Sequence, residues 1–174
     1  LANIFTPLSD PAVRAVCLFR FANAVIVSSI MGFMPLMAAE RGVKMTSIGV
    51  IVSGFLLFSG FLQWPFGKLS DRVDRSRMIV AGQILHVVGL VLMSWMTSRA
   101  GSWAPLFIMS VGTGVAVAAA TAESGRLGRI YGHGALIGLF NTAMSFGTAA
   151  GPLLAGFVLD HLGIRKVFFV LGIL

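Results

Sequence analysis

The 174 residues of this chain are 57% hydrophobic and only 11% charged, and their mean hydropathy is +0.93. Water-soluble domains carry about 25% charged residues, so this composition excludes a soluble globular fold and indicates that lipid is the main solvent. The net charge of +7 does not indicate a nucleic-acid-binding protein. The 13 basic residues lie mainly in short segments between apolar blocks, without the interleaved aromatic residues of single-strand binders.

Long apolar blocks follow one another along the chain, and a membrane-spanning helix needs about 20 such residues. We predict transmembrane helices at 13–39, 48–66, 78–97, 105–123, 135–159 and 163–174. The last block is shorter than a full span, and the chain begins with Leu1 instead of Met, so we expect a fragment of a longer protein. The predicted fold is one all-α domain over residues 1–174, a six-helix transmembrane bundle with short connections.

The basic residues also predict how the bundle is oriented. Alternating connections place the N-terminus, 67–77 and 124–134 on one side of the membrane, with eight basic residues against five on the other. The positive-inside rule therefore predicts that the N-terminus and the 67–77 loop are cytoplasmic, in a multi-pass protein of the cell (inner) membrane. The single cysteine, Cys17, excludes an internal disulfide, and the three scattered histidines predict no metal site.

A short pattern occurs twice in the chain. Gly67 is followed four residues later by Asp71, and Gly156 is followed in the same way by Asp160. In both copies basic residues follow the aspartate, and the two glycines are 89 residues apart. Because three predicted helices separate the copies, they lie on opposite sides of the membrane. This indicates two three-helix repeats of inverted topology.

The loop after the second predicted helix carries the most specific motif. It resembles the loop motif of Major Facilitator Superfamily (MFS) transporters, in which Gly, Leu, a small residue, Asp and two Arg occur at fixed spacing. The matching residues are Gly67, Leu69, Ser70, Asp71, Arg72 and Arg75, whereas Asp74 and Ser76 depart from the pattern.

Elementary chemistry offers two interpretations of this loop. A glycine permits close backbone approach at a turn, and Asp71 can accept hydrogen bonds from a helix start and pair with a cation. The resemblance implies that the cluster latches the cytoplasmic helix ends and opens when the transporter changes face. The alternative is a polar loop with a capping aspartate and positive-inside arginines.

The fifth predicted helix contains a second motif, formed by Gly147, Gly151, Pro152 and Gly156. It resembles the Gly-Pro motif of many exporters in the same family. Small residues four apart form a flat face that allows close helix packing, and the proline adds a kink point. We interpret this motif as a helix-packing face and assign it no coupling role.

The fourth predicted helix indicates which half of the transporter this is. Gly112 and Gly114 match the family pattern, but Ile108 stands where the first half usually has Arg. We therefore expect the C-terminal half, whose partner would be the other six-helix half, in the same chain or in a second subunit. The six acidic residues lie in loops or at the ends of the predicted spans, so no proton relay is expected in the core of this half.

Polar residues inside the spans are candidates for the substrate cavity, which the first and fourth helices of each half line in this family. Arg20 and Asn23 lie in the first span, and Asn141 and Ser145 share a face of the fifth. Arg20 either lines the cavity or extends toward the membrane interface. The resemblance implies a secondary active transporter of a small solute that works by alternating access, without a cofactor, and not an enzyme. The alternative is a non-transporting membrane scaffold or assembly factor with the same fold.

Overall fold

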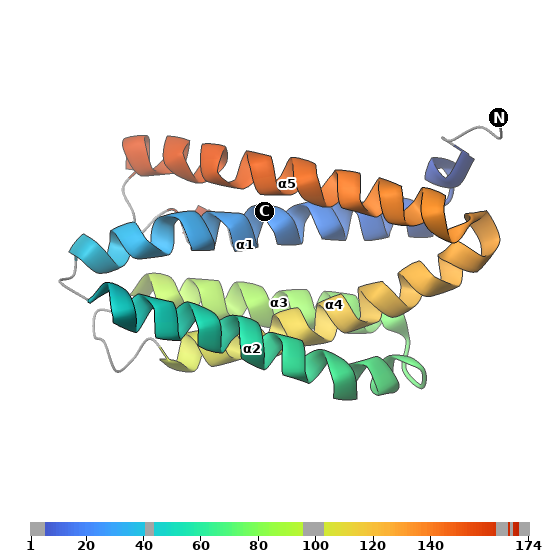
Figure 1. Ribbon diagram of the computed structural model, residues 1–174, viewed down its shortest axis with the longest axis horizontal. Coiled ribbons are helices and arrows are strands. Elements are labelled where there is room, and N and C mark those ends of the chain that lie inside the picture. Colours follow the sequence, from blue (N-terminus) through green and yellow to red (C-terminus); the bar gives the residue numbers. More distant parts are fainter. Residues whose placement is uncertain (1–5, 41–43, 96–102, 163–166, 168, 171–174) are drawn as a thin grey trace.

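The computed structural model describes residues 6–40, 44–95, 103–162, 167, 169 and 170 of the chain. The described part is helical throughout (Figure 1). A short 3-10 helix and five long helices follow one another: η1 (Thr6–Ser9), α1 (Pro11–Glu40), α2 (Met45–Ser70), α3 (Arg75–Trp95), α4 (Trp103–Tyr131) and α5 (His133–Leu162).

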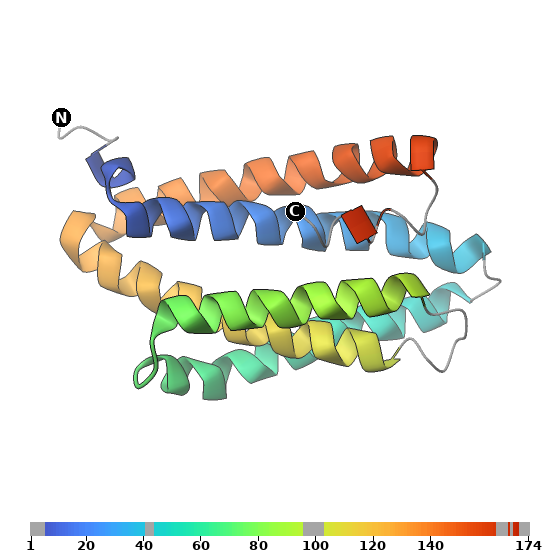
Figure 2. The same cartoon turned by 180° about the vertical axis from the view of Figure 1, so that it is seen from behind.

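The five long helices run side by side, up and down the long axis of the bundle (Figures 1 and 2). Each has the length and the apolar composition needed to cross a membrane. Large apolar side chains such as Leu57 and Leu153 are exposed on the outside of the bundle, which suits contact with lipid. The predicted all-α membrane bundle is therefore confirmed for the described residues, and the chain is a multi-pass membrane protein.

The helices are longer than hydropathy alone predicts. The expected loop at 124–134 is wrong, because α4 continues to Tyr131 and α5 begins at His133. Only Gly132 separates them, with a φ of +93° that favours glycine. Likewise, the expected 67–77 loop shortens to a four-residue turn between α2 and α3. The predicted sixth span lies outside the described residues except for three helical positions at 167, 169 and 170.

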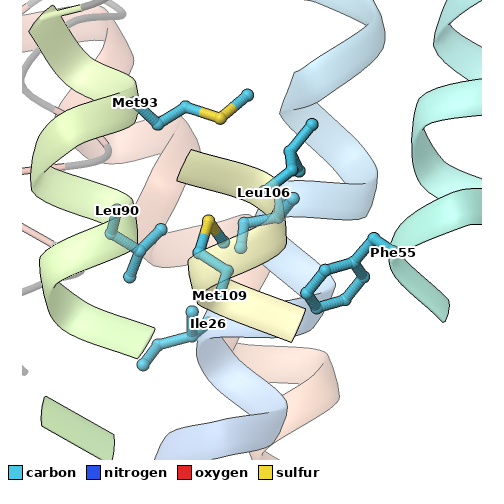
Figure 3. Close-up of a cluster of buried hydrophobic side chains, with 7 residues drawn as sticks. Ile26, Phe55, Leu90, Met93, Leu106 and Met109 are labelled. Atoms are coloured by element: carbon cyan, nitrogen blue, oxygen red, sulfur yellow. The ribbon is translucent and has the colours of Figure 1, made fainter. Parts of the chain in front are cut away.

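Helix pairs pack in a defined order, with α1 against α5, α2 against α4, and α3 against α4. A buried apolar cluster contains side chains from α1, α2, α3 and α4 and holds these four helices together (Figure 3). It consists of Ile26, Ile30, Phe55, Leu90, Met93, Leu106 and Met109. Beside it, the fully buried His86 of α3 lies 3.0 Å from the hydroxyl oxygen of Thr113 of α4 through its Nδ1 atom. This contact agrees with a structural role for His86.

Candidate functional site

The turn between α2 and α3 carries the sequence motif. Gly67 and Leu69 lie in the last turn of α2, and Asp71, directly after Ser70, is the C-cap residue of this helix. The amide of Arg72 donates to the carbonyl of Leu69 at 2.9 Å, and the Ser70 hydroxyl donates to the carbonyl of Gly67 at 2.7 Å. Among the described residues, an added Cβ at Gly67 would meet nothing within 4 Å, so Gly67 makes no close backbone approach within this part of the chain.

Asp74, not Asp71, caps the start of α3. Its Oδ1 accepts a hydrogen bond from the amide of Arg77 at 2.9 Å, and its carbonyl accepts the first helical bond from Met78. The expectation that Asp71 holds its neighbouring helix start is therefore wrong. The physical reason is position, because the capping residue is the one directly before the first helical residue, and α3 begins at Arg75.

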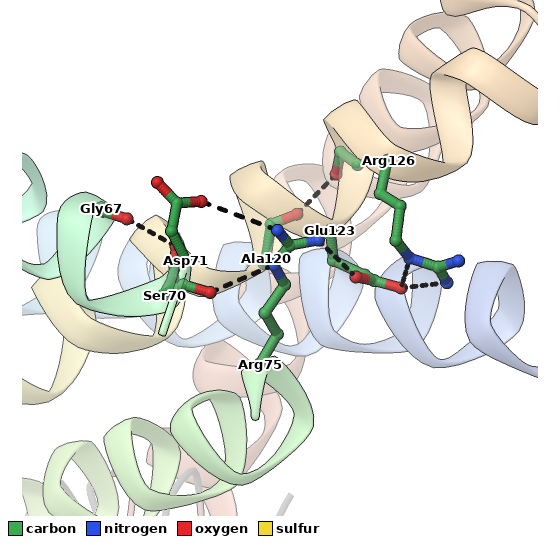
Figure 4. A network of polar contacts seen from close by, with 8 residues as sticks. Gly67, Ser70, Asp71, Arg75, Ala120, Glu123 and Arg126 are labelled. Carbon is green, nitrogen blue, oxygen red and sulfur yellow. Dashed lines mark hydrogen bonds and ion pairs between the residues drawn. The ribbon is translucent and has the colours of Figure 1, made fainter. Parts of the chain in front are cut away.

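Arg75 joins three helices at this end of the bundle (Figure 4). Its Nη1 lies 3.2 Å from Oε2 of Glu123 in α4, and its Nε donates to the carbonyl of Ser70 at 3.3 Å. Its Nη2 lies 3.7 Å from Oδ1 of Asp71. Glu123 also accepts hydrogen bonds from Arg126, one turn further along α4, with the Nε donor at 2.9 Å. We call the set Asp71, Arg75, Glu123 and Arg126 the polar network.

The contacts of the polar network differ in strength. The side chain of Glu123 is 15% exposed and shared by two arginines, whereas that of Asp71 is 71% exposed and makes one long contact. Exposed ion pairs contribute about 0–1 kcal/mol, and hydrogen bonds to charged groups away from water about 1.5–3 kcal/mol. Glu123 is therefore the structural anchor, and the Asp71 carboxylate remains largely free to meet another partner.

Sequence reasoning found part of this network. It placed Asp71 and Arg75 in a candidate gate but missed Glu123 and Arg126. A glutamate followed three residues later by an arginine is a recognised helical pair, and this pattern was the available signal that α4 continues past Glu123. Arg72 is exposed, and no ion pair or side-chain hydrogen bond to it is found among the described residues.

The turn between α2 and α3 lies at the same end of the bundle as η1 and the α4–α5 junction (Figure 1). This arrangement follows the alternation of connections expected from the sequence.

The candidate cavity residues fall into two groups that the structure does not bring together. Arg20 of α1 donates to the Thr121 hydroxyl of α4 at 3.1 Å through Nη2, and Asn23 is half-buried one turn further on. Asn141 and Ser145 are exposed and line a hollow of about 420 Å³ on α5. Residues on another face of α5 contact α1, so Asn141 and Ser145 point away from it.

The glycines of the fifth helix differ in how closely they approach α1. An added Cβ at Gly147 would lie 2.9 Å from Cβ of Ala24, and one at Gly151 would lie 2.6 Å from the carbonyl oxygen of Val25. At Gly156 the nearest atom among the described residues, in the ring of Phe33, would be 3.7 Å away, an ordinary contact. Gly147 and Gly151 therefore form the close contact, next to the exposed Pro152.

None of this geometry resembles a catalytic or metal centre. Among the residues that the structure describes, no three His, Cys, Asp or Glu side chains come together as metal ligands. The candidate site is a polar joint between helix ends.

Comparisons with known proteins agree with this architecture. An MFS-type transporter of Methanocaldococcus jannaschii is 26% identical to the chain over 151 residues, which are 87% of the chain and 39% of that protein. The fosmidomycin resistance protein of Escherichia coli is 29% identical over 164 residues, 92% of the chain and 39% of that protein. The riboflavin transporter RibZ of Clostridioides difficile is 24% identical over 136 residues, 78% of the chain and 30% of that protein.

The chain thus spans two fifths or less of the length of these three relatives. No solved structure gave a significant match. The sequence profile of the Major Facilitator Superfamily matches residues 16–174. This match covers most of the chain and includes the turn between α2 and α3, as well as all of α2 to α5. The chain therefore belongs to the Major Facilitator Superfamily, a family of transporters and not of enzymes.

Proposed function

We propose that the chain is one six-helix half, the C-terminal one, of a secondary active transporter. It moves a small solute across the cell (inner) membrane by alternating access, with the turn between α2 and α3 on the cytoplasmic side. Two named relatives are called after chemically different compounds, fosmidomycin and riboflavin. The proposal therefore names a small solute and no particular compound.

The exposed carboxylate of Asp71 is the observation that carries the proposal. The start of α3 already has its cap in Asp74, and the Arg75 contact to Asp71 is long and exposed. Arg75 itself is held in place by Glu123 and by the carbonyl of Ser70. An aspartate held beside a fixed arginine, with most of its surface free, suits a contact with a helix N-terminus of the other half. Such a contact would form in one facing state and break in the other.

The four cavity candidates suit the same mechanism. Polar side chains inside a membrane protein face a cavity or another protein segment, because lipid cannot satisfy them. Arg20 and Asn23 would line the solute path from α1. Asn141 and Ser145 are exposed on α5 and would face the other half.

The test is a pair of matched substitutions in the complete transporter, reconstituted in vesicles. Asp71→Asn removes the charge that the gate contact needs. Asp74→Asn removes a charge from the same turn but keeps a good helix cap, since asparagine caps as well as aspartate. A charge-assisted contact is worth about 1.5–3 kcal/mol, so Asp71→Asn should slow turnover per folded molecule roughly tenfold or more. Asp74→Asn should leave turnover near normal, and neither variant should weaken solute binding.

Two results would contradict the proposal in different ways. Equal turnover in the two variants would remove the gate assignment and leave a structural loop. No solute flux in the unmodified complete protein, at normal folding, would reject transport and favour the scaffold interpretation.

A further inference from the structure

The residue just before α1 makes two contacts with its two carboxylate oxygens. Oδ1 of Asp10 accepts a hydrogen bond from the amide of Ala12 at 2.8 Å, which caps the start of α1. Oδ2 accepts a hydrogen bond from the hydroxyl of Tyr131 at 3.0 Å. Tyr131 is the last residue of α4, so this second contact ties the start of α1 to the α4–α5 junction.

Apolar packing surrounds the tie and holds the same three helices. A buried cluster joins the first turns of α1, the last turns of α4 and the first turns of α5, and the Tyr131 ring packs against it. Its members are Val13, Val16, Leu127, Leu136 and Phe140. The hydrogen bond between Tyr131 and Asp10, which we call the tie, is thus a directional contact beside a well-packed apolar cluster.

The same stretch of α4 carries both the tie and the polar network. Glu123 and Arg126 belong to the network, and Tyr131 follows on the same uninterrupted helix. Eight residues of α-helix span about 12 Å. Arg126 also acts on Asp10 through its charge. The pKa of Asp10 is lowered mainly by the Ala12 amide, then by the Tyr131 hydroxyl and, to a smaller extent, by Arg126.

Charges consequently alternate along this end of the bundle. The order is Asp71, Arg75, Glu123, Arg126 and Asp10. These contacts connect the α2–α3 turn to the start of α1 through one continuous segment of α4.

We infer that Asp10 and Tyr131 are positioning residues that connect the proposed gate at Asp71 to α1, so that α1 and the gate change position together. The inference rests on the proposed transport function. It goes beyond that function because it assigns a role to two residues outside the loop motif. It differs from simple helix capping, which needs only Oδ1 of Asp10.

The two contacts of Asp10 can be separated by substitution. Tyr131→Phe removes one hydroxyl, keeps the ring in the apolar cluster and leaves the cap of α1 intact. Ser124→Ala is the matched control, because the Ser124 hydroxyl donates to the carbonyl of Ala120 within α4 itself. Each variant loses one hydroxyl hydrogen bond from the same end of α4, but only Tyr131→Phe loses a bond between helices.

The experiment uses the complete protein in lipid nanodiscs. One spin label is placed at the exposed Gly134 at the start of α5, and one at the cytoplasmic end of a helix in the other half. Distance distributions between the labels give the ratio of the two facing states, and thermal unfolding verifies that each variant is folded. Tyr131→Phe should change the ratio about threefold to tenfold, and Ser124→Ala less than twofold.

Combining Tyr131→Phe with Asp71→Asn provides the decisive measurement. If the two sites act through one network, the double variant should change the ratio by less than the product of the single effects. Independent multiplication of the effects, or no change in Tyr131→Phe, would overturn the inference alone. A single distance population in the unmodified protein would overturn alternating access, and this inference with it.

Discussion

The close contact between α1 and α5 leads to a quantitative prediction about Gly151→Ala. An added Cβ at this position lies 2.6 Å from the carbonyl oxygen of Val25, which is backbone and cannot rotate away. Restoring ordinary van der Waals contact requires α1 and α5 to separate by roughly 1 Å. Overpacking of this kind costs about 1–3 kcal/mol. Replacing a helical glycine by alanine also gains about 1 kcal/mol in helix propensity, so the overpacking cost has to be measured against a control.

Gly156→Ala provides that control five residues further along the same helix. The propensity gain is the same, but among the described residues the added Cβ would meet only the Phe33 ring, at 3.7 Å. The difference in unfolding free energy between the two variants should therefore be about 1–3 kcal/mol, with Gly151→Ala the less stable. Thermal or denaturant unfolding of the complete protein in detergent measures it. Equal stability of the two variants would show that α1 and α5 do not approach as closely as the structure indicates.

Three further predictions concern the end of the bundle that carries the polar network. Glu123→Gln should lower the unfolding free energy by about 1–3 kcal/mol, and Asp71→Asn by less than about 1 kcal/mol. The reason is that the Glu123 side chain is mostly shielded from water, whereas that of Asp71 is exposed. Equal losses of unfolding free energy in the two variants would contradict this ranking. Asp10 has a pKa below its ordinary value of 3.8, chiefly because the Ala12 amide donates to it. The Asp10 carboxylate should stabilise the fold fully above pH 3.8 and lose this effect as the pH falls through its lowered pKa. When unfolding is measured at a series of acid pH values, the difference in unfolding free energy between the unmodified protein and Asp10→Asn should therefore close only as the pH falls through that pKa. A cysteine introduced by Arg72→Cys, in a background without the native cysteine, should react with impermeant thiol reagents from the cytoplasmic side only; labelling of intact cells from outside would reverse the orientation.

Hydropathy predicts the membrane helices of this chain but not where they end. Where a helix ends near charged residues depends on how those charges pair. The mean hydropathy of a sequence window contains no information about this pairing. Glu123 and Arg126 satisfy each other one turn apart, so α4 continues through them. The α2–α3 turn falls inside the predicted 67–77 loop, although it is shorter, because its signals are local. Its two aspartates are three residues apart, and which of them caps α3 depends on where α3 begins; the sequence interpretation selected Asp71, whereas the cap is Asp74.

The polar network shows a second limit of sequence reasoning. Arg75 and its main partner Glu123 are 48 residues apart, on helices that come together only in the folded bundle. Nothing local in either segment indicates the pairing. The tie between Asp10 and Tyr131 joins residues 121 apart and was missed for the same reason.

The inverted repeat is clearer in the structure than in the sequence. Gly67 and Gly156 are 89 residues apart, and this offset carries the bounds of α1, residues 11–40, to 100–129, close to those of α4 at 103–131. It carries α2, residues 45–70, to 134–159, inside α5 at 133–162. Under this relation the packing of α2 on α4 corresponds to that of α5 on α1, and both pairs pack closely in the bundle.

The two corresponding crossings bring matching positions together with different residues. In one, an added Cβ at Gly114 of α4 would lie 2.9 Å from Cβ of Leu62 of α2. The 89-residue offset converts this pair into Val25 of α1 and Gly151 of α5, which is the close contact found at the other crossing. Each crossing needs one residue without a side chain so that the backbones can approach, and either helix can supply it. The glycine lies on α4 in one crossing and on α5 in the other, so the repeat keeps a close contact at matching positions while the sequence similarity between its two copies remains weak.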